Sequence, residues 1–343
     1  MLNFKPFHDF IESLSDKEKN DTVINICMHN GPDPDAIGSA LGMQFILNNL
    51  GWNSQIYYSG EISHPQNKTL VNVLDIPLSK TEENIEGINI CVDGTEANSC
   101  VKTADFVIDH HKNITKAKLS IIEPSYGSCV SLIWQLFKEL KIELTSEDSN
   151  VATALLLGVR TDTNDLTSEN MVVEDFTAYQ ELLDFADKEA LQKIMNYPLP
   201  RYLYDKRINL HREGNFYESN GTFVGGIGFI TGAQRDAIAI LSEEYTRMES
   251  VNTAVIFAIT DKKNLHVSIR SSLTSLDVGA LCHELFGDFG GGKAYKGGAT
   301  IPLSFYGELE NGEASAFWKI TCKQMFKKIL KESWKDGSHK EEE

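Results

Sequence analysis

The sequence predicts an α/β protein of two domains, a doubly wound, mainly parallel sheet followed by a smaller mixed-sheet α/β domain. Three observations predict this. From residue 22 onward, short β-branched runs alternate with longer helical stretches. A polar, helical stretch over residues 171–215 then interrupts this alternation, and a second α/β pattern follows it. The length of 343 residues also exceeds what one hydrophobic core usually serves, which favours two domains.

The first domain is expected over residues 1–190. Its predicted strands are residues 23–28, 54–58, 88–92, 106–108 and 119–122. Apolar residues at three- and four-residue spacing predict helices at 37–50, 128–140 and about 147–159, where Thr145 and Asp148 are placed as a capping box. Short apolar strands that alternate with helices predict a parallel sheet covered on both faces.

A helical linker is expected over residues 191–217, because the segment Tyr197-Pro198-Leu199-Pro200 breaks regular structure. The second domain, 218–335, has predicted strands at 223–230, 254–260, 265–270 and 299–305, with a hairpin turn at 261–264. Its predicted helices are 233–248, 278–286 and 314–331, and residues 290–298 form a glycine-rich stretch before the last strand. The charged tail, 336–343, is expected to fray.

Composition excludes several classes of protein. No apolar run approaches the roughly 20 residues that span a bilayer, and Lys5, Asp9 and Glu12 interrupt the N-terminal segment, so neither a membrane protein nor a signal peptide is expected. The six cysteines include no C-x-x-C pair, which predicts reduced, buried thiols in a cytoplasmic protein. A net charge of −17 disfavours long nucleic acids but permits a small phosphate ligand where metal ions reverse the local field.

The strongest local signal is the segment H-N-G-P-D-P-D-A-I-G-S at residues 29–39, directly after the first predicted strand. Ligands on open α/β sheets bind outside the carboxyl ends of the strands, so a site belongs here. His29, Asp33 and Asp35 provide one imidazole and two carboxylates in a loop that glycine and proline bend. A helix-capping aspartate explains any one of these acids, but it does not explain the whole set.

Further acid and histidine residues stand at the ends of later elements. Asp93 ends the strand 88–92, Asp109-His110-His111 ends the strand 106–108, and Asp162 ends the helix that starts near residue 147. Each feature alone is compatible with a turn or a helix cap. Together they predict one site, because the carboxyl ends of neighbouring parallel strands meet at the same edge of a sheet.

The residue types indicate the chemistry of this site. Carboxylates and imidazoles without thiolates favour Mn²⁺, Mg²⁺, Zn²⁺ or Fe²⁺ over a cysteine-rich structural zinc site. Five closely packed aspartates would raise one another's pKa unless two divalent ions lay among them. Two ions about 3.5–4 Å apart clamp a phosphoryl group and activate water.

These motifs resemble the DHH phosphoesterase superfamily over nearly the whole chain, with residues 29–39, Asp93, the Asp109-His110-His111 triplet and Asp162 as its four ordered motifs. The domain order and the glycine-rich stretch look most like the subgroup of nanoRNases and 3′-phosphoadenosine-5′-phosphate (pAp) phosphatases. The resemblance implies two divalent ions, Mn²⁺ first and Mg²⁺ as the alternative. It implies the following ligands: His29, Asp33 and Asp93 for one ion, and Asp35, Asp93, His110 and Asp162 for the other. It places His111 toward the phosphoryl oxygen or leaving group, and Asp109 behind the histidines as an orienting residue.

The second domain is expected to bind substrate, with the active site in the cleft between the domains. Arg270 ends a strand, where its guanidinium suits two phosphate oxygens, and Gly290, Gly291 and Gly292 allow backbone N–H groups to approach an anion. Lys293 stands where the family usually has a histidine, and it offers a charged point contact to phosphate. A second departure is the segment 164–166, where relatives often carry a glycine and an aromatic residue.

The expected function is a divalent-metal-dependent phosphohydrolase that cleaves short oligonucleotides from one end and dephosphorylates pAp by two-metal activation of water. The first alternative is a phosphodiesterase for cyclic or linear di-AMP, although no room precedes residue 23 for the membrane and sensory segments of dedicated relatives. A family II pyrophosphatase ranks third, since it would carry a basic motif in place of residues 290–293. A non-catalytic nucleotide sensor is the alternative from a different class. The resemblance makes a homodimer plausible and gives no reason to expect a membrane or long-duplex partner.

Overall fold

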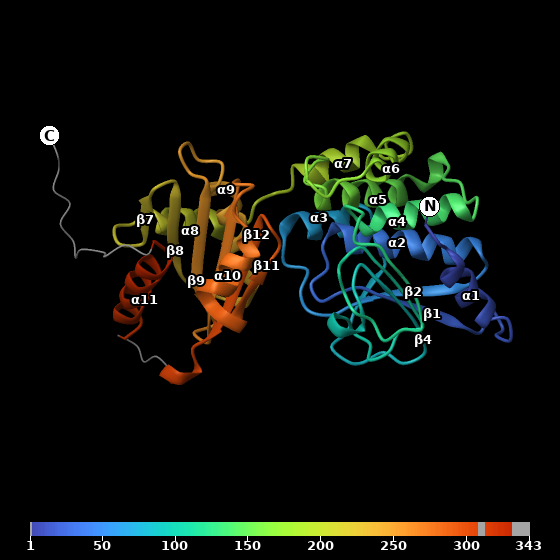
Figure 1. The fold of residues 1–343 in the computed structure, drawn as a ribbon, viewed down its shortest axis with the longest axis horizontal. Helices are drawn as coiled ribbons and strands as arrows, with labels where there is room; N and C mark the ends of the chain where they lie inside the picture. Colours follow the sequence, from blue (N-terminus) through green and yellow to red (C-terminus); the bar gives the residue numbers. More distant parts are fainter. Residues whose placement is uncertain (1, 308–312, 331–343) are drawn as a thin grey trace. The chain divides into compact units, whose positions relative to one another are not determined.

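The computed structural model describes residues 2–307 and 313–330, which fall into two compact units divided between Pro198 and Leu199 (Figure 1). The units meet in sequence at Pro198, inside the predicted breaker segment, and the stretch 191–217 is divided between them. The charged tail at 336–343 lies outside the described residues. Over the residues that are described, no helix is both long and apolar enough to cross a membrane.

The first unit is built on a six-stranded sheet in the order β3-β2-β1-β4-β5-β6, with every neighbouring pair parallel. The strands are β1 (Val23–Cys27), β2 (Asn53–Tyr58), β3 (Leu78–Lys80), β4 (Ile88–Val92), β5 (Phe106–Asp109) and β6 (Leu119–Ile122). After β1 the chain forms β2 and β3 on one side of β1. It then crosses over, so that β4 pairs with β1 on the other side. The carboxyl ends of β1 and β4 therefore flank the point where strand order reverses, which is where ligands bind in such sheets.

Helices cover one face of this sheet. They are α1 (Lys5–Ser13), α2 (Pro34–Asn49), α3 (Pro65–Val73), α4 (Cys129–Glu139), α5 (Ser149–Asp162), α6 (Val173–Leu183) and α7 (Lys188–Met195). Figure 1 shows α2, α4 and α5 on the same side of the strands, and apolar side chains of these helices join those of the strands in one core. On the other face Cys27, Cys91 and Val107 pack against Cys100 and Val101 from a connecting segment. The second face is therefore covered by loops where helices were expected.

The second unit has a mixed sheet in the order β11-β12-β10-β9-β8-β7, in which only β8 and β9 are parallel. Its strands are β7 (Phe216–Ser219), β8 (Thr222–Ile230), β9 (Thr253–Thr260), β10 (Asn264–Ser271), β11 (Gly290–Gly292) and β12 (Lys296–Pro302). Its helices are α8 (Arg201–Leu210), α9 (Asp236–Tyr245), α10 (Val278–Phe286) and α11 (Glu313–Leu330). Core side chains from α10 and α11 pack on one face of the sheet, and those from α8 and α9 pack on the other.

The predicted fold class is confirmed, with local differences. Helix α2 begins at Pro34, three residues before the predicted start, because Asp33 caps it by accepting bonds from the Asp35 and Ala36 amides. Within the glycine-rich stretch, residues 290–292 pair with β12 as a strand that was not predicted. The final strand ends at Pro302 instead of residue 305. All six cysteines are unpaired and buried, as predicted.

Candidate metal centre

The predicted ligands of the first unit meet at one edge of its sheet. His29 follows β1, Asp93 follows β4, and His110 follows β5. Asp35 lies in the first turn of α2, and Asp162 is the last residue of α5. Asp93 adopts a left-handed backbone with φ of 51°, a conformation that aspartate and asparagine tolerate better than most residues.

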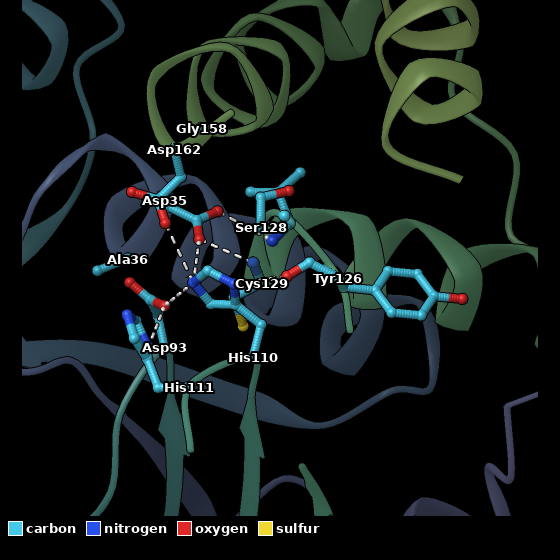
Figure 2. Close-up of polar contacts among 12 residues, drawn as sticks. Asp35, Ala36, Asp93, His110, His111, Tyr126, Ser128, Cys129, Gly158 and Asp162 are labelled. Atoms are coloured by element: carbon cyan, nitrogen blue, oxygen red, sulfur yellow. Dashed lines mark hydrogen bonds and ion pairs between the residues drawn. The ribbon is translucent and has the colours of Figure 1, made fainter. Parts of the chain in front are cut away.

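His110 lies at the middle of a buried acidic group, as Figure 2 shows. Its Nε2 lies 3.1 Å from Asp162 Oδ2, 3.4 Å from Asp93 Oδ1 and 3.6 Å from Asp35 Oδ2. On the opposite side of the ring, Nδ1 lies 3.1 Å from the carbonyl oxygen of Tyr126. A carbonyl only accepts hydrogen bonds, so Nδ1 carries a proton, and Nε2 is the ring nitrogen that faces the acids.

His29 forms a second group with Asp33 and Asp93. Its Nε2 lies 3.6 Å from Asp93 Oδ2 and 3.9 Å from Asp33 Oδ1. Its Nδ1 lies 3.2 Å from the carbonyl oxygen of Asn30, which selects the same tautomer as in His110. Asp93 thus contributes one carboxylate oxygen to each group.

Asp109 is hydrogen-bonded to His111 and belongs to neither of these two groups. Asp109 Oδ1 accepts a bond from the His111 amide at 3.1 Å and lies 2.9 Å from His111 Nδ1. Asn113 Nδ2 donates to the other carboxylate oxygen at 2.8 Å. Burial acts to raise the pKa of Asp109, but these bonds outweigh it and hold the pKa below its usual value. Asp109 is therefore a carboxylate that orients the imidazole of His111.

The electrostatics of the centre show an excess of buried negative charge. Burial, and then the neighbouring carboxylates, raise the pKa of Asp35 well above its usual value, and burial is the main cause of the raised pKa of Asp93. Burial acts to lower the pKa of His29 and His110, because it disfavours the charged ring, but the combined effect of the adjacent acids is larger. They raise the pKa of His29 to about 11 and that of His110 to about 10. The carboxylates thus retain protons on the histidines wherever no other cation neutralises them.

The donor set suits divalent metal ions. The side chains form three groups, and within each group the potential ligand atoms lie within 4.8 Å of one another. The groups are His29, Asp33 and Asp93; Asp35, His110 and Asp162; and Asp93, His110 and His111. Asp93 Oδ1 and His110 Nε2 are buried, and neither makes a hydrogen bond within the described chain. Buried polar atoms are normally satisfied, so these two atoms fit a site that binds a charged ligand. The structure thus brings all six predicted ligands together, and the role of each remains a prediction.

The predicted substrate residues of the second unit are only partly grouped. Arg270 lines a cavity of about 360 Å³ with residues 297–300 of β12, and Gly290, Gly291, Gly292 and Lys293 are not among its lining residues. Packing explains Gly290 and also Gly279 in the neighbouring helix α10. A Cβ at position 290 would lie 2.2 Å from the carbonyl oxygen of Cys282, and one on Gly279 would lie 2.5 Å from that of Gly292. Strand β11 and helix α10 therefore lie too close together for a Cβ at Gly290 or at Gly279.

Sequence reasoning missed several residues of these sites. The buried carboxylate of Asp175 accepts bonds from the Gly127 and Val172 amides, both at 2.9 Å, and so holds the segment whose Tyr126 carbonyl contacts His110. No motif marks Asp175. In the second unit His266 was missed beside Arg270, although alternation along β10 places both on one face.

The fold and the site together define an α/β protein whose acid and histidine centre suits divalent metal ions. Residues 23–159 match the DHH family, N-terminal domain, and residues 226–317 match the DHHA1 domain. The chain belongs to the DHH family.

Several relatives are similar to this chain. An uncharacterized protein of Methanocaldococcus jannaschii is 30% identical over 308 residues, which cover 87% of this chain and 62% of that protein. The bifunctional oligoribonuclease and PAP phosphatase NrnA of Thermus thermophilus is 29% identical over 181 residues, 49% of this chain and 51% of that one. A probable manganese-dependent inorganic pyrophosphatase of Lactobacillus gasseri is 28% identical over 169 residues, 46% of this chain and 53% of that one. The chain thus covers between about half and 62% of these relatives' lengths.

A solved structure shows the same fold. An exopolyphosphatase-related protein from Bacteroides fragilis has a TM-score of 0.64 at 17% identity and covers 97% of this chain and 99% of its own.

Proposed function

We propose that this protein is a divalent-metal-dependent phosphohydrolase that cleaves short oligonucleotides from one end and removes a phosphate from pAp. The observation that carries this proposal is the position of Asp93, whose two carboxylate oxygens face His29 in one ligand group and His110 in the other. Asp93 Oδ1 and His110 Nε2 are buried there without hydrogen bonds. A single divalent ion would compensate only two of the four negative charges of the ligand aspartates. The cytoplasmic location that we propose is supported by six unpaired, buried cysteines.

In this proposal one ion is held by His29, Asp33 and Asp93, and the other by Asp35, Asp93, His110 and Asp162. Imidazole ligands among the carboxylates favour Mn²⁺ over Mg²⁺, which takes mostly oxygen ligands. A pair of divalent ions supplies positive charge to phosphoryl oxygens and makes water more acidic. The Lactobacillus gasseri relative, named as manganese-dependent, supports the choice of Mn²⁺.

The chain's own residues prepare this chemistry. The Tyr126 and Asn30 carbonyls hold Nδ1 protons on His110 and His29, which leaves each Nε2 free of a proton in the neutral ring. Asp109 accepts from Nδ1 of His111 and so orients that ring. In the proposed reaction His111 donates a proton from Nε2 to the leaving oxygen as its bond to phosphorus breaks, and Asp109 stabilises the imidazolium before the transfer.

The second unit provides the reason to propose a nucleotide substrate. Arg270 and the segment Gly290, Gly291, Gly292 and Lys293 are proposed to bind the anionic backbone of the substrate. The matched DHHA1 domain includes all five residues. The relative from Thermus thermophilus, named as an oligoribonuclease and PAP phosphatase, supports short oligonucleotides and pAp as substrates.

A substrate panel tests the proposal. Purified protein is incubated with a dinucleotide, a longer oligonucleotide, pAp, cyclic di-AMP and pyrophosphate, each with Mn²⁺ and with Mg²⁺, and products are separated by chromatography. We expect turnover of the dinucleotide and pAp with Mn²⁺, slower turnover with Mg²⁺, and no cleavage after chelation. Failure to cleave both the dinucleotide and pAp under all conditions would contradict the proposal.

The same panel separates the alternatives. The pyrophosphatase name of the Lactobacillus gasseri relative makes pyrophosphate the second candidate substrate, and preferential phosphate release from it would replace the nucleotide assignment. Preferential opening of cyclic di-AMP would identify a cyclic-dinucleotide phosphodiesterase. Tight binding of a nucleotide without turnover of any substrate would identify a sensor.

A further inference from the structure

The second unit has a further cavity near the β7 edge of its sheet, whereas the predicted substrate residues lie on β10 and at β11. Its volume of about 520 Å³ falls within the range of about 300–1,000 Å³ typical of small-ligand sites. Its lining residues come from α8 and the turn that follows, from β8, and from the first turns of α11. It shares no lining residue with the cavity at Arg270, and β9 lies between β8 and β10. The two cavities are therefore separate.

The cavity forms where one strand loses its neighbour. Strand β7 pairs with β8 only as far as Gly225, and the register of β8 against β9 shifts just beyond that point. An unpaired strand edge leaves backbone groups without partners. Side chains of α8 satisfy two of them here: Asn209 Nδ2 donates to the Ile227 carbonyl at 3.1 Å, and Lys206 Nζ donates to the Phe229 carbonyl at 2.8 Å. Specific hydrogen bonds thus hold the floor of this cavity in place.

A chain of hydrogen bonds fixes the aromatic wall of the cavity. Trp318 Nε1 donates to Asn215 Oδ1 at 2.8 Å, and Asn215 Nδ2 donates to the Asn209 carbonyl at 2.7 Å. The backbone carbonyl of Asn215 also accepts from the Gly226 amide at 2.7 Å. The ring of Phe229, which also lines the cavity, lies 6.0 Å from that of Trp318 between centroids. Two half-buried aromatic rings are therefore held as one apolar wall.

Two cations stand beside this wall. Lys206 is half-buried and Arg212 is exposed. Over the described ranges neither side chain forms an ion pair with a carboxylate, and Glu213 is the single acid among the lining residues. Burial lowers the pKa of Lys206, because its ammonium loses contact with water. An anion bound in the cavity would give that charge a partner, so the site suits an anionic ligand.

We propose that this cavity is an accessory site for a nucleoside monophosphate, in which Lys206 and Arg212 bind the phosphate and the base lies against the rings of Trp318 and Phe229. A phosphate joined to a flat aromatic base matches cations placed next to an aromatic wall. The inference rests on the proposed function in one respect, since cleavage of an oligonucleotide from its end and dephosphorylation of pAp both release such a molecule. It adds a place for this product within the second unit, apart from the metal centre.

The test follows Trp318 itself. Full-length wild-type protein labelled with ¹⁵N in tryptophan is titrated with 5′-AMP in EDTA, so that no metal ion contributes, and the indole N–H signals are recorded by NMR. Trp318→Phe identifies the signal of Trp318. We expect a saturable shift of that signal, with adenosine and inorganic phosphate each binding at least about tenfold more weakly. An unchanged Trp318 signal at about 10 mM 5′-AMP would overturn the proposal, and benzoate that bound as tightly as 5′-AMP would overturn the nucleotide assignment.

Variants test the two cations. Lys206→Gln removes the charge but keeps a donor for the Phe229 carbonyl, and Arg212→Gln removes a charge at an exposed position. Each should weaken 5′-AMP at least about fivefold. Arg235→Gln is the matched control, because Arg235 is exposed and lines the other cavity, and it should leave the titration unchanged. Equal effects of Arg212→Gln and Arg235→Gln would overturn the proposal, and this comparison decides the matter where Lys206→Gln disturbs the contact with Phe229.

The outcome is separable from that of the proposed function. A saturable Trp318 response together with a wild-type protein that cleaves no substrate would retain the accessory site and reject the phosphohydrolase. Turnover of the dinucleotide and pAp by a protein whose Trp318 signal ignores 5′-AMP would do the reverse.

Discussion

The carboxylate of Asp35 and the backbone amide of Cys129 are hydrogen-bonded at 2.7 Å, although 94 residues separate them in sequence. The other carboxylate oxygen accepts from the Val130 amide at 3.0 Å. Both amides belong to the first turn of α4, whose unpaired N–H groups favour a negative charge. One aspartate thus fixes α2 against α4 at the acid and histidine centre.

The first prediction concerns the acid shared by the two ligand groups. Asp93→Asn should weaken Mn²⁺ binding by more than about 100-fold, since loss of a direct ligand should exceed the loss of an outer partner. Asparagine also tolerates the φ of 51° at this position. Burial raises the pKa of Asp93, so its charge opposes folding near neutral pH, and the metal-free variant should melt at a higher temperature than the metal-free wild type.

Calorimetry and thermal melts, each with EDTA or Mn²⁺, measure both effects. Asp75→Asn is the matched control, because Asp75 is exposed and has a similar φ of 49°. Asp93→Asn protein that still gains the full Mn²⁺-induced shift in melting temperature would contradict the shared-ligand role.

The second prediction concerns the contact between α2 and α5. A Cβ at Gly158 would lie 2.6 Å from Val130 Cγ2 and 3.1 Å from Asp35 Cα. Gly158→Ala should therefore separate α5, which carries Asp162, from α2, and lower the free energy of unfolding by about 1–3 kcal/mol. Denaturant unfolding should show this loss, and calorimetry should show weaker Mn²⁺ binding. A destabilised variant with unchanged Mn²⁺ affinity would mean that the helices adjust without moving the ligands.

The third prediction tests Asp175 as a positioning residue. Asp175→Ala leaves the Gly127 and Val172 amides without their acceptor, which should cost about 1–3 kcal/mol of stability. It should also lower Mn²⁺ affinity about 10- to 100-fold, because the Tyr126 carbonyl no longer orients His110. Asp187→Ala removes a comparable pair of amide bonds at the start of α7 and should reduce stability alone. Similar Mn²⁺ affinities for the two variants would assign Asp175 a purely structural role.

The fourth prediction is a pH dependence of stability. Burial, then Arg235, lowers the pKa of His266 from 6.5 to about 4, so between these pH values the unfolded chain binds the proton more readily. The contribution of His266 to stability is therefore complete above pH 6.5 and is lost as the pH falls toward 4, by at most about 3 kcal/mol. His266→Gln should remove this dependence, so the difference in unfolding free energy between wild type and variant should shrink from pH 7 to pH 4. A constant difference over that range would show that His266 is not held neutral by the fold.

Much of the fold was predictable because its signals are local. The strands β1, β4, β5 and β6 were predicted to within a residue, since buried parallel strands appear as short apolar runs. Helix α10 was predicted with the bounds it has. The elements that were missed, α1, α3, β3, β7 and β11, are all short. Helix α1 nevertheless carries a readable signal, because Phe7, Phe10 and Leu14 recur at three- and four-residue spacing and are buried.

The candidate centre was predictable for the same reason. Parallel strands direct their carboxyl ends to one edge, so residues that follow β1, β4 and β5 meet wherever such a sheet forms. The packing that holds them was not predictable. Asp175 approaches Gly127 across 48 residues, and no periodicity or motif encodes that contact.

The sequence by itself determined the kind of protein, because the order of apolar runs specifies a parallel sheet and the residue types at its edge specify the metals that suit it. The tertiary structure alone decided which of those residues share an ion-sized space, which glycines serve packing, and that Lys206 and Arg212 lie with Trp318 in one pocket. The physical reason is that pKa shifts, close approaches and unpaired charges depend on distances through space, which are set only when distant segments pack together.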